Sequence, residues 1–177
     1  MSVAAYGSAS LGGDGQPIAI ATGFELDVLN GKGFIANTNL ISGLGASETP
    51  IFLLTNPTGS GVTLYGKAFR LGVVFTGSPQ YAVWRLYKNP TITSNGTAIT
   101  PQNLKIMGSP PASVVTPFLQ PTISNNGTFM SVYAQHSGAP SIIELLIVID
   151  AGNSILLTTS NSNPNISTYA GLVWSEK

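Results

Sequence analysis

Turn-forming residues interrupt this chain every few positions. Its 177 residues include 20 glycines and 12 prolines. No stretch of twelve residues keeps the i, i+3, i+4, i+7 apolar spacing of an amphipathic helix. Asn-Gly pairs at 30–31, 95–96 and 126–127, and Gly-Asn at 152–153, supply the positive-φ positions that tight turns need. The sequence therefore favours short strands joined by turns.

Alternating apolar and polar residues predict about nine strands. The clearest strand is Ala68–Thr76, whose apolar face holds Phe69, Leu71, Val73 and Phe75. Tyr81–Tyr87 follows with Ala82, Trp84 and Leu86 on one face, and the four residues 77–80 between these strands predict a hairpin. Further strands are expected at 18–21, 33–37, 51–55, 128–135, 141–150, 154–159 and 169–176. We predict an all-β fold, an antiparallel two-sheet β-sandwich that is jelly-roll-like rather than immunoglobulin-like.

The predicted strand at 141–150 is apolar on both faces. One face carries Ile143, Leu145, Ile147 and Ile149, and the other carries Ile142, Leu146 and Val148 together with Glu144. Apolar residues on both faces imply that both faces are covered. One face belongs to the core, and the second is expected under either a neighbouring subunit or a loop of the same chain.

The two ends of the chain differ in composition. Residues 1–16 are small and glycine-rich, and we expect a flexible N-terminal arm, either a frayed terminus or a segment that orders on a partner. Residues 17–177 are expected to form a single β-sandwich domain.

Two segments of the chain echo each other. Asn89–Ala98 and Gln120–Phe129 both run from Pro-Thr-Ile through a polar pair to Asn-Gly-Thr. Two copies are too few for a solenoid, so we expect two similar corners of a sheet.

Charged residues are scarce. Seven Lys and Arg balance seven Asp and Glu, so 8% of the chain is charged, where about 25% is usual. Such a surface has little protection against association. The scattered cations argue against nucleic-acid binding, and the absence of cysteine removes disulfides and thiolate metal sites. Without a signal peptide or an apolar run long enough to span a membrane, we expect a soluble protein with no membrane partner.

No group of residues predicts catalysis or a cofactor. Gly61–Ala68 nearly matches a phosphate-binding loop, but Ala68 lacks the hydroxyl that magnesium needs and a strand follows it. The lone His136 is expected in a loop or at a strand end. Glu25 and Asp27 would share a strand face, either as solvated charges or as calcium ligands. We therefore expect no enzyme, no metal and no cofactor.

The outward residues Tyr81, Arg85 and Tyr87 suit either a subunit interface or a carbohydrate platform.

Three segments resemble the small virion structural proteins of tailed bacteriophages. They are Gly31–Asn37, Ser47–Gly61 and Trp84–Ala98, and the corner at Val148–Leu157 is similar to one in phage jelly-roll modules. The resemblance implies a capsid decoration (cement) protein, a trimeric β-sandwich seated between major capsid subunits. It carries over no site residue.

We therefore expect a homotrimer that binds the major capsid protein, assembles in the host bacterial cytoplasm and resides on the capsid surface of the virion. The alternative is a receptor-binding or fibre knob that recognises a host surface glycan. The residues expected at interfaces are Tyr6, Leu11, Tyr81, Arg85, Tyr87, Ile142, Leu146 and Val148.

Overall fold

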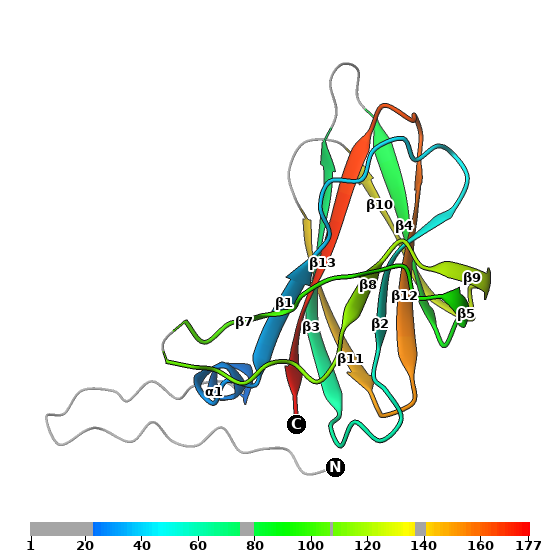
Figure 1. The fold of residues 1–177 in the computed structure, drawn as a ribbon. Helices are drawn as coiled ribbons and strands as arrows, with labels where there is room; N and C mark the ends of the chain where they lie inside the picture. The colour runs from blue at the N-terminus through cyan, green and yellow to red at the C-terminus, as the bar shows by residue number, and fades with distance from the viewer. Residues whose placement is uncertain (1–22, 75–79, 107, 137–140) are drawn as a thin grey trace, which may run out of the picture.

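The structure is a computed structural model that describes residues 23–74, 80–106, 108–136 and 141–177. Two antiparallel sheets pack face to face across one hydrophobic core (Figure 1). Each strand has an apolar face that must be buried against a second layer, and the two sheets bury each other's. The predicted all-β, two-sheet sandwich is confirmed.

The elements fall into two large sheets, one small sheet and one helix. The five-stranded sheet contains, in spatial order, β11 (Ser141–Ile149), β3 (Leu64–Val74), β13 (Ser167–Glu176), β1 (Gly33–Asn37) and β7 (Gln102–Asn103). The six-stranded sheet contains β10 (Thr128–His136), β4 (Tyr81–Lys88), β12 (Ser154–Asn161), β2 (Thr49–Thr55), β8 (Pro117–Leu119) and β6 (Thr97–Ala98). The small sheet pairs β5 (Thr91–Ser94) with β9 (Thr122–Asn125), and the helix is α1 (Gly23–Leu29).

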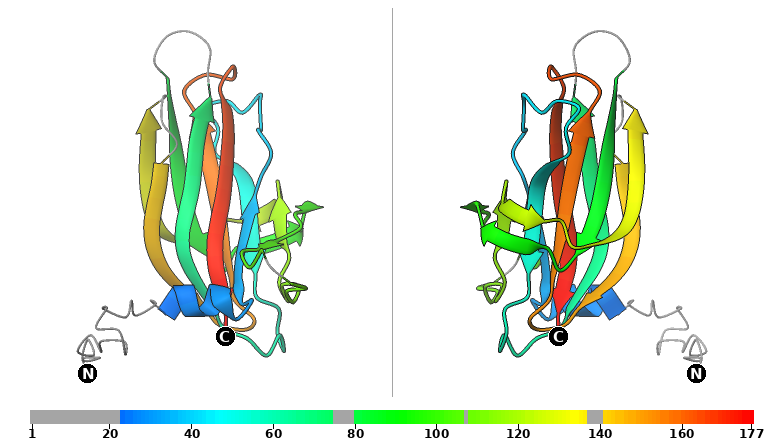
Figure 2. Two further views of the ribbon diagram at one scale, coloured as in Figure 1. Left: turned by 90° about the vertical axis from the view of Figure 1, so that its left-hand side faces the viewer. Right: turned by 90° about the vertical axis from the view of Figure 1, so that its right-hand side faces the viewer.

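The eight longer strands pair in nested order. β1 pairs with β13, β2 with β12, β3 with β11 and β4 with β10, all antiparallel. Consecutive pairs in this series belong to alternate sheets. The innermost strands β10 and β11 consequently form the ends of the two sheets on one side of the sandwich, as Figure 2 shows.

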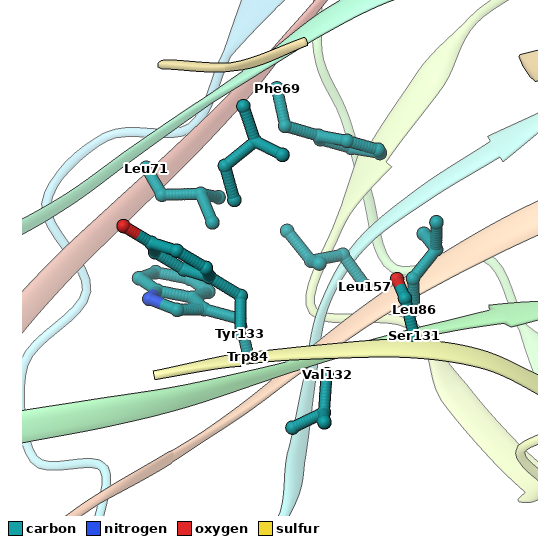
Figure 3. A pocket seen from close by; sticks show the side chains of 9 residues that line it. Phe69, Leu71, Trp84, Leu86, Ser131, Val132, Tyr133 and Leu157 are labelled. Carbon is teal, nitrogen blue, oxygen red and sulfur yellow. The ribbon is translucent and has the colours of Figure 1, made fainter. Parts of the chain in front are cut away.

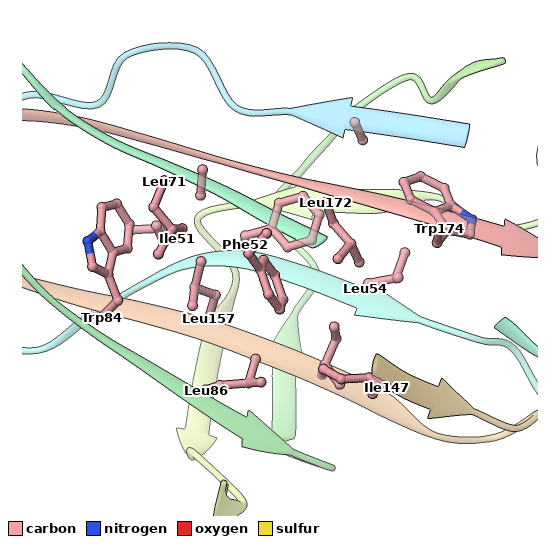
Figure 4. Close-up of a cluster of buried hydrophobic side chains, with 14 of the residues drawn as sticks. Ile51, Phe52, Leu54, Leu71, Trp84, Leu86, Ile147, Leu157, Leu172 and Trp174 are labelled. Carbon is pink, nitrogen blue, oxygen red and sulfur yellow. The ribbon is translucent and has the colours of Figure 1, made fainter. Parts of the chain in front are cut away.

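The core lies between the two sheets (Figure 4). Phe52, Trp84 and Leu157 enter it from the six-stranded sheet, while Leu71 and Trp174 enter from the five-stranded sheet. Each of these side chains is at most 4% exposed. The apolar faces predicted for β3 and β4 therefore point into the core wherever the structure describes them.

The predicted hairpin between the strands at 68–76 and 81–87 is wrong. β3 pairs with β11 and β13, whereas β4 pairs with β10 and β12, so the chain passes from one sheet to the other between them. Alternation identifies the apolar face of a strand but not the strand beside it. Both apolar faces point into the same core from opposite sheets.

A short helix replaces the shared strand face expected for Glu25 and Asp27. Both residues lie in α1, and Asp27, 9% exposed, forms an ion pair with Lys177 (3.1 Å). The Lys177 ammonium also lies 5.2 Å from the centre of the Tyr65 ring. Because α1 has only seven residues, a search for helical periodicity over longer windows misses it. None of the helical structure in the described residues is long and apolar enough to span a membrane.

The two echoing segments pair with each other. Ile92 lies opposite Ile123, its counterpart in the repeat, within the β5–β9 sheet. The relation extends outward, because Thr97 pairs with Leu119 as Thr128 pairs with Lys88. The repeat therefore builds a local two-fold arrangement, which is more specific than the two separate corners that the sequence predicts.

The β5–β9 sheet lies on the outer side of the six-stranded sheet (Figures 1 and 2). Leu53 and Leu156 pair across β2 and β12, alternate with core residues, and are 0% exposed. The outward face of β2 and β12 is therefore covered at these two residues. On the side of the molecule where β10 and β11 lie, apolar side chains are instead exposed.

Candidate interaction surface

Exposed apolar side chains gather on the two edge strands β10 and β11. We call this surface the β10–β11 edge and define it by Phe129, Met130, Val132, Tyr133, Ile142, Leu146 and Val148. These side chains are between 37% and 80% exposed. Val132 and Phe129 point out of the six-stranded sheet, whereas Ile142, Leu146 and Val148 point out of the five-stranded sheet. Exposed apolar side chains that gather on one side of a molecule mark an interaction site more often than scattered residues do.

β10 is exposed along nearly its whole length. Of its nine residues only Gln135 is buried. The strand pairs on one side with β4, and the outward Val132 lies opposite Arg85. The sequence predicts this strand but not its exposure. A signal was present, because Phe129–Tyr133 places apolar residues on both faces, as β11 does.

β11 covers only one of its two apolar faces within the described residues. Ile147 and Ile149 are buried in the core, whereas Ile142, Leu146 and Val148 are 68%, 80% and 53% exposed. The expectation of two covered faces therefore fails for the isolated chain as the structure describes it. Among the described residues no loop lies over the second face, and both sequence-based alternatives, a neighbouring subunit and a loop of the same chain, stay predictions.

The sandwich is open between the edge strands β10 and β11. A cavity of about 160 Å³ lies there, lined by core residues such as Phe69, Trp84 and Ile143 and by Tyr133 of β10 (Figure 3). The Tyr133 and Ser141 hydroxyls hydrogen-bond at 3.1 Å and join β10 to β11. A second hollow of about 200 Å³ includes Met130 and Val148.

The three outward residues predicted on β4 do not form a common platform. Tyr81 and Tyr87 stand at opposite ends of β4, about 20 Å apart at the rise of a strand. Tyr81 is 46% exposed and lies beside the His136 ring, whereas Tyr87 packs edge-on against Phe129. This spacing is too long for one sugar ring to contact both.

Arg85 and Tyr87 belong to a polar cluster centred on Glu48. The Arg85 Nε lies 3.7 Å from Glu48 Oε2, and the Glu48 Oε1 accepts hydrogen bonds from Thr158 and Asn126. Arg85 also donates to the Ser160 hydroxyl at 3.1 Å. The sequence analysis missed Glu48, because the loop before β2 reaches these strands only in the folded chain.

The same cluster affects the Tyr87 phenol. Burial and a hydrogen bond with the Glu48 carboxylate raise the pKa of Tyr87 above its ordinary value of 10.0, although Asn126 and Arg85 act in the opposite direction. A carboxylate beside a phenol disfavours the phenolate. Tyr87 therefore stabilises the fold as a neutral hydrogen-bonding group.

Some of the remaining predicted residues lie outside the described ranges, and the others lie in strands. Tyr6 and Leu11, the arm at 1–16 and the strand at 18–21 lie outside the described residues. His136 is the last residue of β10, which confirms its placement at a strand end. The strand β3 begins at Leu64, inside the segment that resembles a phosphate-binding loop, where that motif would require a helix.

Within the described residues, no three His, Cys, Asp or Glu side chains lie close enough together to hold a metal ion. Asp27 is committed to Lys177, so the calcium alternative for Glu25 and Asp27 gains no support.

Neither a known protein-family model nor a curated protein matches this chain. The resemblance to phage virion proteins therefore rests on the sequence segments themselves, and function has to be argued from the site.

Proposed function

We propose that this protein is a capsid decoration (cement) protein of a tailed bacteriophage, a non-enzymatic subunit that binds the outer capsid surface and stabilises the head. The observation that carries the proposal is the exposed β10–β11 edge. Its most exposed member is Leu146, at 80%. A chain with so apolar an edge and so few charges is expected to associate with other subunits.

The topology supports the same proposal. We infer that the nested pairing of β1 with β13 through β4 with β10 is that of a jelly roll, in which a long hairpin folds over into two Greek keys. This is the architecture that the resemblance to phage modules implies. Fold alone does not specify function, so the edge remains the stronger argument.

The mechanism is burial of neutral surface between subunits. Covering apolar area contributes about 25 cal/mol per Å² before the cost of association is subtracted. Contacts repeated across several capsid neighbours add avidity to each single contact. Reinforcement of the head would follow from such bridging contacts and requires no chemical step.

The test is binding to phage heads stripped of this protein. We expect the purified chain to cosediment with the heads, to bind no isolated tails, and to raise the temperature at which the heads release DNA. Cryo-electron microscopy of the repopulated particles would show added density on the outer capsid. Density on the tail alone, or no binding to heads, would overturn the proposal.

Location also separates the proposal from the receptor-binding alternative. A fibre knob would label the tail and bind host glycans, with loss of binding in Tyr87→Ala. The structure gives this alternative less support, because Arg85 and Tyr87 are already engaged with Glu48.

A further inference from the structure

We propose that the β10–β11 edge is the surface through which copies of this chain associate, so that a second copy closes the open side of the sandwich. The inference rests on the proposed function in that it takes the chain to work inside an assembly, and it assigns the β10–β11 edge to contact between copies rather than to contact with the capsid. It can fail independently, because a monomeric chain could still decorate a capsid.

Within the part of the chain that the structure describes, both strands of this edge have an unpaired side. β10 and β11 each contain nine residues and end their sheets. Natural proteins usually protect such edges with charges, prolines or bulges. Here β11 has a single charged residue, Glu144, and β10 has none besides the titratable His136. The edge is therefore long and has little charge to protect it, although each strand contains one bulge.

A bulge in each edge strand affects how a second copy can bind there. The β3–β11 register shifts between Glu144 and Ile147, and the β4–β10 register shifts between Phe129 and Ser131. A bulge interrupts a continuous hydrogen-bonded ladder. We therefore expect side-chain packing around Leu146 and Val148, rather than one extended sheet, to join two copies.

Core packing gives a second reason for an occupant. The hollows of about 160 Å³ and 200 Å³ are both open to solvent at this side, and they offer space for side chains of a second copy. Exposed apolar side chains of both edge strands lie at this side, so a second copy would meet apolar surface on β10 as well as on β11.

Charge favours a second copy over a charged partner. The rim of the edge carries cations at Lys67, Arg70 and Lys88 and anions at Glu144 and Asp150. A rim with both signs offers counter-charges to an identical rim, but it repels part of any uniformly charged surface. An apolar centre within a mixed rim is self-complementary.

The experiment compares two lysine substitutions by sedimentation equilibrium of the full chain. Leu146→Lys changes the edge, and Ile106→Lys is the matched control, because Ile106 is 95% exposed and follows β7 at the opposite end of the five-stranded sheet. We expect an oligomer for the wild type and the control. We expect Leu146→Lys to raise the dissociation constant at least about 30-fold.

Chemical labelling keeps the test decisive if a lysine disturbs folding. Because the chain has no cysteine, Leu146→Cys and Ile106→Cys each introduce one unique thiol. We expect the thiol at 146 to react with a maleimide at least tenfold more slowly in the oligomer than in the diluted monomer, and the thiol at 106 to react equally in both. Equal reactivity at 146, or a wild-type monomer at tens of micromolar, would overturn the inference.

The outcomes separate this inference from the proposed function. A chain that is monomeric but binds heads would reject self-association and leave decoration standing. An oligomer that is dissociated by Leu146→Lys but binds no heads would support self-association and reject decoration.

Discussion

At the scale of single residues, buried polar side chains fix connections that hydrophobic patterning leaves open. Glu176, only 6% exposed, accepts hydrogen bonds from the Ser113 hydroxyl (2.5 Å), the Val114 amide (3.1 Å) and the Trp174 indole (3.2 Å). It thereby ties the last strand to the segment before β8. Two of its partners, Ser113 and Val114, lie 63 and 62 residues away in sequence, so no local pattern predicts them.

Removing this carboxylate should be costly. Glu176→Ala leaves the Val114 amide and the Trp174 indole without this acceptor, whereas the Ser113 hydroxyl keeps the Val115 carbonyl (2.8 Å), and we expect a loss of about 2 kcal/mol in the free energy of unfolding. Urea denaturation measures the difference. Glu144→Ala, at an exposed position of β11, is the control and should change stability by less than about 0.5 kcal/mol. Similar losses in the two variants would contradict the role given to Glu176.

Tyr87 gives a pH-dependent prediction. Its pKa is raised in the fold, so the neutral phenol contributes stability that is complete below pH 10 and is lost as pH rises through the folded value. In Tyr87→Phe this alkaline component of the unfolding free energy should be absent. Denaturation between about pH 9 and pH 11 measures it.

A second variant checks the cause of the shift. Glu48→Gln removes the neighbouring carboxylate, so the pKa of Tyr87 should fall toward 10.0. The ultraviolet absorbance of the phenolate follows the titration. An unchanged or higher value in Glu48→Gln would show that the carboxylate does not act on Tyr87.

At the scale of elements, the β5–β9 corner shows how an internal repeat becomes structure. Asn89 and Gln120 hold matching positive φ values of 52° and 50°, and the two Asn-Gly turns have Gly96 and Gly127 at 82° and 87°. A Cβ at Gly96 would overlap the Leu119 carbonyl, and a Cβ at Gly127 would overlap the Lys88 carbonyl. Each half of the repeat thus packs its glycine on the backbone of the other half.

These two glycines should therefore be equally intolerant of substitution. We expect Gly96→Ala and Gly127→Ala each to cost about 3 kcal/mol, because the backbone must shift in addition to adopting an unfavourable φ. Gly59→Ala is the control, since Gly59 also has a positive φ (78°) but open space around its Cβ position. It should cost about 1 kcal/mol. Thermal unfolding of the three variants compares them, and equal losses would contradict the packing argument.

Elements also show where sequence reasoning stops. The bounds predicted for the strands at 33–37 and 141–150 agree with β1 and β11 within a residue. The partner of β3 was predicted wrongly, because a short loop can either reverse a strand within one sheet or cross to the other sheet. The strands β5 to β9 were not predicted, since each has at most four residues and their pairing is non-local.

At the scale of the whole molecule, low charge and an open edge lead to the same expectation. With only 14 charged residues in 177, the surface has few ion pairs to offer a partner. The described residues show two salt bridges, Arg85 with Glu48 and Lys177 with Asp27, and both are internal to the chain. Association should therefore depend on apolar contact.

The corresponding prediction concerns salt. Raising sodium chloride from about 0.1 M to about 1 M screens charge interactions but leaves apolar burial in place. We expect the oligomer of the full chain to persist or strengthen across this range in sedimentation experiments. Dissociation at high salt would show that charge pairs, rather than the β10–β11 edge, hold the copies together.

The sequence by itself determined the fold class, the positions of the main strands and their apolar faces, because alternation and turn chemistry are local properties. It also identified β11 as apolar on both faces. Only the tertiary structure decided that β10 shares its side of the sandwich, that the gap between them opens into the core, and that Glu48 joins Arg85 and Tyr87. These features depend on pairing between distant segments, where sequence periodicity carries no information about which strands become neighbours.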